Sequence, residues 1–95
     1  MTSACDLTLA YISQGKFTES EPLAREALEF YKKNQPDVWQ RYRAESLLGA
    51  SLAGQKKSGE AKPLLQDGFN GMLARKDTIA FPDRYHLDRA REWVK

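Results

Sequence analysis

Hydrophobic residues recur at spacings of three and four along most of this chain, which is the period of α-helices that bury one face. The pattern predicts five helices, over residues 3–14, 17–33, 38–53, 58–76 and 82–95. Gly15, Asn34, Pro36 and Gly54 interrupt it, and residues of these types commonly end helices. Valine, isoleucine and threonine are few and never alternate with polar residues, so no strand is predicted. The sequence therefore predicts an all-α protein.

Polar residues near the start of three predicted helices match the preferences of helix N-termini. Thr18 and Glu21 have the spacing of a capping box, while Asp37 and Ser58 are of types favoured as N-caps. Pro22 is compatible with a helix only near its start. We therefore expect side-chain caps at the beginning of the second, third and fourth helices.

Two glycines lie inside the fourth predicted helix, where glycine is unfavourable. Gly68 and Gly71 each cost about 1 kcal/mol relative to alanine. The apolar face of this helix consists of Ala61, Leu64, Leu65, Gly68, Phe69, Met72 and Leu73. Glycine on such a face lets another backbone approach closely, so we expect a neighbouring helix to pack against these two positions.

The same pattern of residues occurs more than once. Seven positions recur at an offset of 41, namely Leu7, Tyr11, Gln14, Ser20, Pro22, Leu23 and Ala27 against Leu48, Leu52, Gln55, Ala61, Pro63, Leu64 and Gly68. Four more recur at an offset of 46, namely Trp39, Ala44, Leu47 and Leu48 against Tyr85, Ala90, Trp93 and Val94. A fixed period of this length is typical of stacked repeats, whose members bury their apolar faces against one another.

The repeats divide the chain into two helical pairs and a fifth helix within one domain. Repeat one covers residues 1–36, repeat two covers 37–77, and a C-terminal capping helix covers 82–95. Short connections make neighbouring helices antiparallel, with Leu48 and Leu52 at the centre of the core. About two and a half repeats leave apolar surface at the ends. We expect that surface around Tyr11, Phe17 and Leu28, where a symmetric dimer would bury it.

Composition restricts the class of partner. The 95 residues include 15 basic and 13 acidic ones, spread along the chain, so nucleic acid is not implied. No segment is apolar enough to span a membrane, and the N-terminus lacks the features of a signal peptide. The single cysteine, Cys5, excludes an intramolecular disulfide and is expected to be inert. We expect a cytoplasmic protein.

Residues that could support catalysis do not gather in the sequence. The single histidine, His86, has no second histidine or cysteine at metal-binding spacing, so we expect it to be solvated or to cap a helix. The aspartates are scattered, at Asp67, Asp77, Asp83 and Asp88. No glycine-rich phosphate loop follows a strand. The sequence therefore predicts no enzyme activity, no cofactor and no bound metal.

The repeat residues resemble those of the tetratricopeptide repeat family. In the second copy, Leu48-Gly49-x2-Leu52 and Ala61-x3-Leu65 match its signature, and in the first copy Leu7-x3-Tyr11, Gly15-Lys16-Phe17 and Ala27-Leu28 match. The long period and the prolines at Pro22 and Pro63 look most like the kinesin light chain type of repeat. Asp6 and Leu47 stand where family members that clamp a terminal carboxylate use other residues. The resemblance implies an α-α superhelix without that clamp.

The same resemblance implies a protein-binding scaffold, whose concave groove is lined by the first helix of each pair. It places six candidate partner-binding residues there, Leu9, Ile12, Arg43, Ser46, Ala50 and Arg89. Arg43 and Arg89 are equivalent positions, so a peptide or helix with acidic side chains is the expected partner. The alternative is a C-terminal dimerisation or docking module of a larger protein, for example a bacterial signalling protein, with the terminal helices forming a homodimer.

Overall fold

The computed structural model describes residues 4–35, 37–79 and 85–94, and these residues form an all-α superhelix of the tetratricopeptide type. Its helices are α1 (Ala4–Ser13), α2 (Phe17–Asn34), α3 (Trp39–Gly54), α4 (Ser58–Ala74) and α5 (Tyr85–Trp93), with a short 3-10 helix, η1 (Lys76–Thr78). No strand occurs within the described ranges. The five predicted helices are confirmed, although the first residues expected of the fifth lie outside the described part of the chain.

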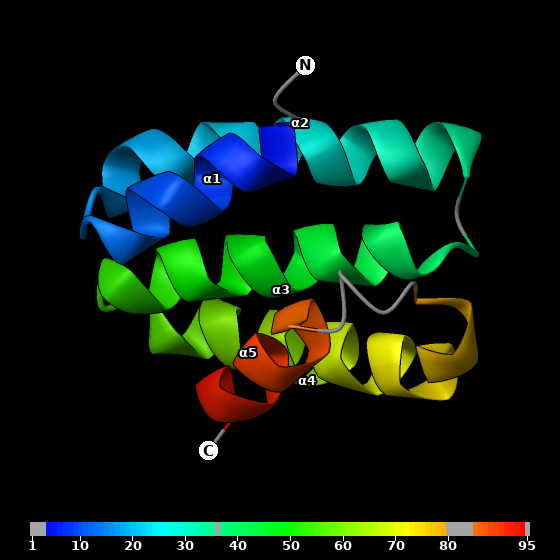
Figure 1. Cartoon of the computed structure of the whole chain (residues 1–95). Coiled ribbons are helices and arrows are strands. Elements are labelled where there is room, and N and C mark those ends of the chain that lie inside the picture. The colour runs from blue at the N-terminus through cyan, green and yellow to red at the C-terminus, as the bar shows by residue number, and fades with distance from the viewer. Residues whose placement is uncertain (1–3, 36, 80–84, 95) are drawn as a thin grey trace.

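The helices stack in chain order. Figure 1 shows α2, α3 and α4 as successive layers, with α1 against α2 and α5 against α4. The closest packing is between α3 and α4, and α1 and α5 both also contact α3. α3 is therefore the central helix, and every residue from Arg43 to Leu52 within it is buried.

Buried apolar residues form two clusters along α3. The larger cluster joins α2, α3 and α4 and includes Leu48 and Leu52, which are 3% and 2% exposed. The smaller one joins Trp39, Met72, Ile79, Leu87 and Ala90. The prediction that Leu48 and Leu52 lie in the core is confirmed. Leu73, which was assigned to the apolar face of α4, is exposed.

Glycine permits the close contact of α3 with α4. A Cβ atom on Gly68 would lie 2.8 Å from the backbone nitrogen of Ser46, and one on Gly71 would overlap the ring of Tyr42. On the other side of the same contact, a Cβ on Gly49 would lie 2.8 Å from Cγ of Leu65. The expectation that these glycines mark close helix approach is confirmed.

The turns that precede α2 and α4 share one geometry. The side-chain caps predicted for α2, α3 and α4 are not formed. Gly15 and Lys56, which are 41 residues apart, both have positive φ, of 76° and 65°. The next amide in each turn, of Lys16 or Lys57, donates to a carbonyl five residues back, as in a Schellman motif. The N-caps of α2, α3 and α4 are Lys16, Val38 and Lys57, without side-chain caps. The predicted capping roles of Thr18, Glu21, Asp37 and Ser58 are therefore wrong.

The apolar surface at the first helices differs from the expected one. Leu28 is buried within the chain, and Tyr11 and Phe17 are half-buried. The large apolar side chains left exposed there are Leu7, at 40%, and Phe30, at 56%. No described helix combines the length and the apolarity that crossing a membrane requires.

Candidate functional site

A groove runs between the first helices of the repeats. It has a volume of about 460 Å³, and we call it the inner groove. Its lining residues are Ile12, Ser13, Phe17, Ala50, Ala53, Gly54, Leu65, Arg89 and Trp93. They come mainly from α1, α3 and α5, as expected of the concave side of such a stack. The structure thus brings together three of the six candidate residues, Ile12, Ala50 and Arg89.

Small residues keep this groove open along α3. A Cβ on Gly54 would lie only 2.3 Å from the ring of Phe17, so the aromatic ring packs directly on the glycine backbone. Ala50 and Ala53 precede it on the same helix and add little bulk. Leu9 packs against the larger core cluster from α1 and is partly buried. The floor of the groove is therefore apolar and shallow.

Arg43 and Ser46 do not line the inner groove, which corrects the sequence-based assignment. Arg43 is 9% exposed, and its guanidinium group lies over the ring of Trp39, 5.1 Å from the centroid. Ser46 is 1% exposed and lies against Gly68 of α4. Both are covered because α3 has neighbours on several sides. Arg89 holds the equivalent place on α5 and is exposed.

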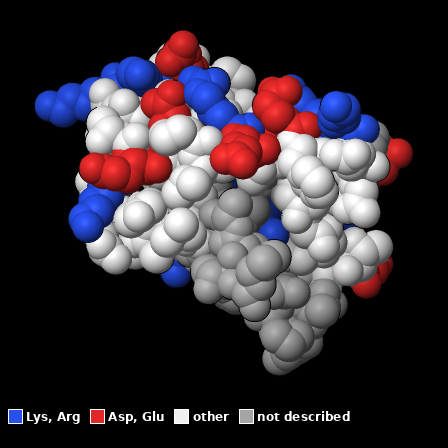
Figure 2. Space-filling model, turned by 90° about the horizontal axis from the view of Figure 1, so that it is seen from above, with Lys and Arg blue, Asp and Glu red and all other residues white. Residues whose placement is uncertain are grey.

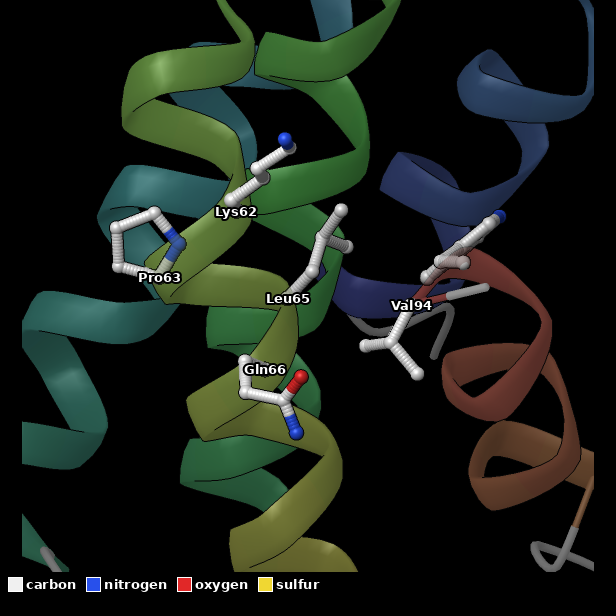
Figure 3. Close-up of a pocket in the computed structure, with 6 residues that line it drawn as sticks. Lys62, Pro63, Leu65, Gln66 and Val94 are labelled. Atoms are coloured by element: carbon white, nitrogen blue, oxygen red, sulfur yellow. The ribbon is translucent and has the colours of Figure 1, made fainter.

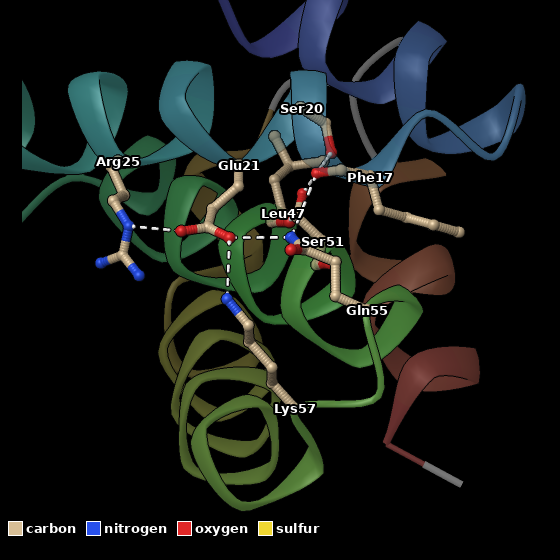
Figure 4. A network of polar contacts seen from close by, with 8 residues as sticks. All are labelled: Phe17, Ser20, Glu21, Arg25, Leu47, Ser51, Gln55 and Lys57. Carbon is tan, nitrogen blue, oxygen red and sulfur yellow. Dashed lines mark hydrogen bonds and ion pairs between the residues drawn. The ribbon is translucent and has the colours of Figure 1, made fainter.

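A polar network joins α2 to the turn between α3 and α4 (Figure 4). The side-chain nitrogen Nε2 of Gln55 donates to the carboxylate of Glu21 at 2.7 Å and to the backbone carbonyl of Phe17 at 3.3 Å. Arg25 and Lys57 form ion pairs with the same carboxylate. The hydrogen bond from Gln55, followed by the one from Arg25, lowers the pKa of Glu21. Deeper in the interface the hydroxyls of Ser20 and Ser51 lie 2.6 Å apart. This network fixes α2 against α3.

Glu45 is a buried carboxyl group that the sequence analysis missed. It is 5% exposed on α3, and one of its oxygens lies 3.6 Å from the guanidinium of Arg41. Burial is the main cause that raises its pKa to about 7, and the carboxyl of Asp67 on α4 raises it further. Arg41 and Lys32 oppose this effect. The sequence carries no clear signal of this burial, because Arg41 and Arg43 precede Glu45 on the same helix and make that stretch look exposed.

His86 is buried, so the expectation that it is solvated is wrong, while the alternative that it caps a helix stays a prediction. It is 4% exposed, and its ring lies 5.9 Å from that of Trp39 at an angle of 40°. It therefore packs α5 against the start of α3. Within the described ranges, no three histidine, cysteine or acidic residues are placed to hold a metal ion.

A second groove lies between α4 and α5, with a volume of about 430 Å³, and we call it the end groove. It is lined by Lys62, Pro63, Leu65, Gln66, Trp93 and Val94. Figure 3 shows Leu65 directed from α4 toward α5, where Val94 lies. Leu65 and Trp93 line both grooves, so they separate the inner groove from the end groove.

Charges of both signs are mixed on the face that Figure 2 shows. Figure 2 shows acidic and basic side chains side by side along one edge of the visible face, with a largely uncharged area beside them. The charges on this face are interspersed and do not form a patch of a single sign.

Comparison with known families supports the repeat assignment. The model of the tetratricopeptide repeat family matches residues 1–34, which include α1 and α2. Searches of curated proteins and of solved structures found no significant match. The match covers about a third of the chain and supports a tetratricopeptide-type repeat in the first helical pair, and repeats of this family generally serve as protein-interaction modules.

Proposed function

We propose that this chain is a protein-interaction module that holds a partner segment, either extended or helical, in the inner groove. The observation that carries the proposal is that α1, α3 and α5 contribute side chains to one groove. Repeat stacks of this type present such surfaces to peptides and helices, and binding rather than catalysis is the role we propose. Pro22 and Pro63, equivalent within α2 and α4, support a repeat of the kinesin light chain type.

The partner segment should combine an apolar side chain with an acidic group. Among the described residues that line the inner groove, Arg89 is the one that is charged, and it is exposed. Ala50, Ala53 and Gly54 leave room for a partner main chain to approach α3. Asp88 and Glu92 also lie on α5 and weaken the positive field around Arg89. Asp88 does so less, because its carboxylate lies 3.6 Å from the guanidinium group of Arg91. We therefore expect electrostatic attraction to raise the association rate of the partner more than its equilibrium affinity.

A charge reversal tests this assignment. Peptides selected from a random display library on the immobilised chain are synthesised and titrated against the parent and against Arg89→Glu. We expect acidic peptides to dominate the selection and Arg89→Glu to weaken them about tenfold, mainly by slower association, with less effect at high salt. Arg91→Glu is the matched control, because Arg91 is on the same helix but does not line the inner groove. Equal losses in the two variants would contradict the role of Arg89.

A second variant tests the groove without changing charge. Ala53 is exposed and lines the inner groove, so Ala53→Leu fills the space and leaves the core intact. We expect this variant to lose peptide binding while it keeps the parent melting temperature. A selected peptide that bound Ala53→Leu and Arg89→Glu as tightly as the parent would exclude the inner groove as its site.

Dimerisation is the second candidate function, favoured by the exposure of Leu7 and Phe30 on the first two helices. Burial of these two side chains in a symmetric contact would remove apolar surface from water. Sedimentation over a range of concentrations tests this candidate. A mass that doubles in the parent and stays monomeric in Phe30→Ser would support it, and a parent that remains monomeric would exclude it.

A further inference from the structure

The end groove is an apolar surface that no described helix covers. Trp93, the last residue of α5, and Val94, which follows it, are only half-buried there, beside Leu65 and Pro63 of α4. The inner groove proposed above for peptide binding lies on the other side of Trp93 and Leu65. The end groove is therefore a separate surface, and its occupant needs a separate argument.

The internal repeat shows what covers the equivalent surface one repeat earlier. Leu65 is equivalent to Ala24 at the offset of 41, and Trp93 and Val94 are equivalent to Leu47 and Leu48 at the offset of 46. Ala24, Leu47 and Leu48 are 1%, 1% and 3% exposed, and they share a cluster with side chains of α4. One repeat earlier, α4 therefore covers the surface that is equivalent to the end groove.

The charge at the edge of the end groove is opposite to the charge at the equivalent place one repeat earlier. Where α4 packs near α2, a carboxylate oxygen of Glu21 lies 3.7 Å from the amino group of Lys57, the N-cap residue of α4. Its equivalent in α4 is Lys62, which lines the end groove. Lys62 forms no ion pair with any other residue of the described ranges. A helix that packed here as α4 packs on α2 would thus place its N-cap residue near a lysine.

We propose that the end groove binds an amphipathic α-helix of a protein partner that carries Asp or Glu at its N-cap. Its apolar face covers Leu65, Trp93 and Val94, and its acidic N-terminus pairs with Lys62. An acidic residue at this place is also favoured by the dipole of the incoming helix. A second copy that docked through its α2 or α4 fits poorly, because the N-caps of those helices are Lys16 and Lys57. Those would place lysine against Lys62.

The probe that tests this proposal comes from the chain itself. Two capped synthetic peptides have the sequence of residues 57–74, one unchanged and one with Lys57→Glu, and each is titrated to millimolar concentration into the isotope-labelled full chain. We expect the Lys57→Glu peptide to shift the amide signals of Leu65, Gln66 and Val94. It should bind about fivefold more tightly than the unchanged peptide, the order expected for one partly exposed ion pair.

Charge reversal on the protein completes the experiment. In Lys62→Glu the preference should invert, so that the unchanged peptide binds more tightly, while Lys76→Glu, in η1 beyond the C-terminal end of α4, should keep the parent preference. Lys62 and Lys76 are both exposed, so both variants are expected to fold. The proposal is overturned by absent shifts, by shifts confined to inner-groove residues such as Ile12 and Ala50, or by equal affinity for the two peptides. Self-association of the chain that shifts the same end-groove signals would assign the surface to a second copy instead.

Discussion

The buried carboxyl group of Glu45 predicts that this protein loses stability as the pH rises through neutrality. Its pKa in the folded chain is about 7, against an ordinary value of 4.5. As the pH rises above 4.5, the unfolded chain releases this proton first, and the folded chain keeps it. The protonated Glu45 therefore contributes its full stabilisation of the folded state below pH 4.5. This contribution decreases between pH 4.5 and 7 and is lost above the folded pKa.

The size of the effect follows from the difference between the two pKa values. A change from 4.5 to about 7 corresponds to at most about 3.4 kcal/mol, since one pKa unit is worth about 1.36 kcal/mol. Structural relaxation around the carboxylate reduces this, and part of the effect falls below pH 5, so we expect a loss of about 2 kcal/mol in the free energy of unfolding between pH 5 and pH 8. In a domain of this size the loss lowers the melting temperature by roughly 10 °C.

Glu45→Gln removes the ionisable group and keeps the shape of the side chain. Urea unfolding at pH 5 and pH 8 should show that this variant is more stable than the parent at pH 8 and nearly independent of pH across the interval. Glu26→Gln is the control, because Glu26 is exposed on α2 and its replacement should preserve the parent pH profile. A parent as stable at pH 8 as at pH 5, or a Glu45→Gln variant with the same pH slope as the parent, would refute the reasoning.

Two further predictions concern packing around α3. Gly68→Ala should destabilise the protein by about 1 to 3 kcal/mol, because its Cβ would press on the backbone of α3 at 2.8 Å, whereas Gly59→Ala has open space and should stabilise α4 by a few tenths to about 1 kcal/mol. Thermal melts that moved in the same direction for both glycine variants would contradict this account of the α3–α4 contact. Leu48→Ala should cost about 2 to 5 kcal/mol in urea unfolding, and a change within about 0.5 kcal/mol would place Leu48 outside the core.

The helices and their buried faces could be predicted because both depend on local periodicity. Ala61, Leu65, Gly68 and Met72 follow the helical period along α4, and all four are buried. Leu73 directly follows Met72 and was assigned to the same face, yet it is exposed. Successive residues of an α-helix point about 100° apart, so Leu73 lies at the edge of the buried stripe rather than inside it.

The helix starts could not be predicted from residue preferences alone. Glu21 has the spacing of a capping residue, but Gln55 and Lys57 lie close to it across the α2–α3 interface and hold its carboxylate there. Lys57 is remote from Glu21 in sequence, so no local rule includes this competition. Lys56 likewise adopts the positive φ that Gly15 adopts one repeat earlier, because the turn geometry is shared by both repeats.

The sequence by itself determined the fold class, the repeat period and the residues at the centre of the core, since each depends on spacing along the chain. Only the tertiary structure decided which residues of the first helices remain accessible. Arg43 and Arg89 are equivalent in sequence, yet Arg43 is buried over Trp39 and Arg89 is exposed at the inner groove. The physical reason is that exposure depends on what packs against a helix, and α3 has neighbours on sides where α5 has none among the described residues.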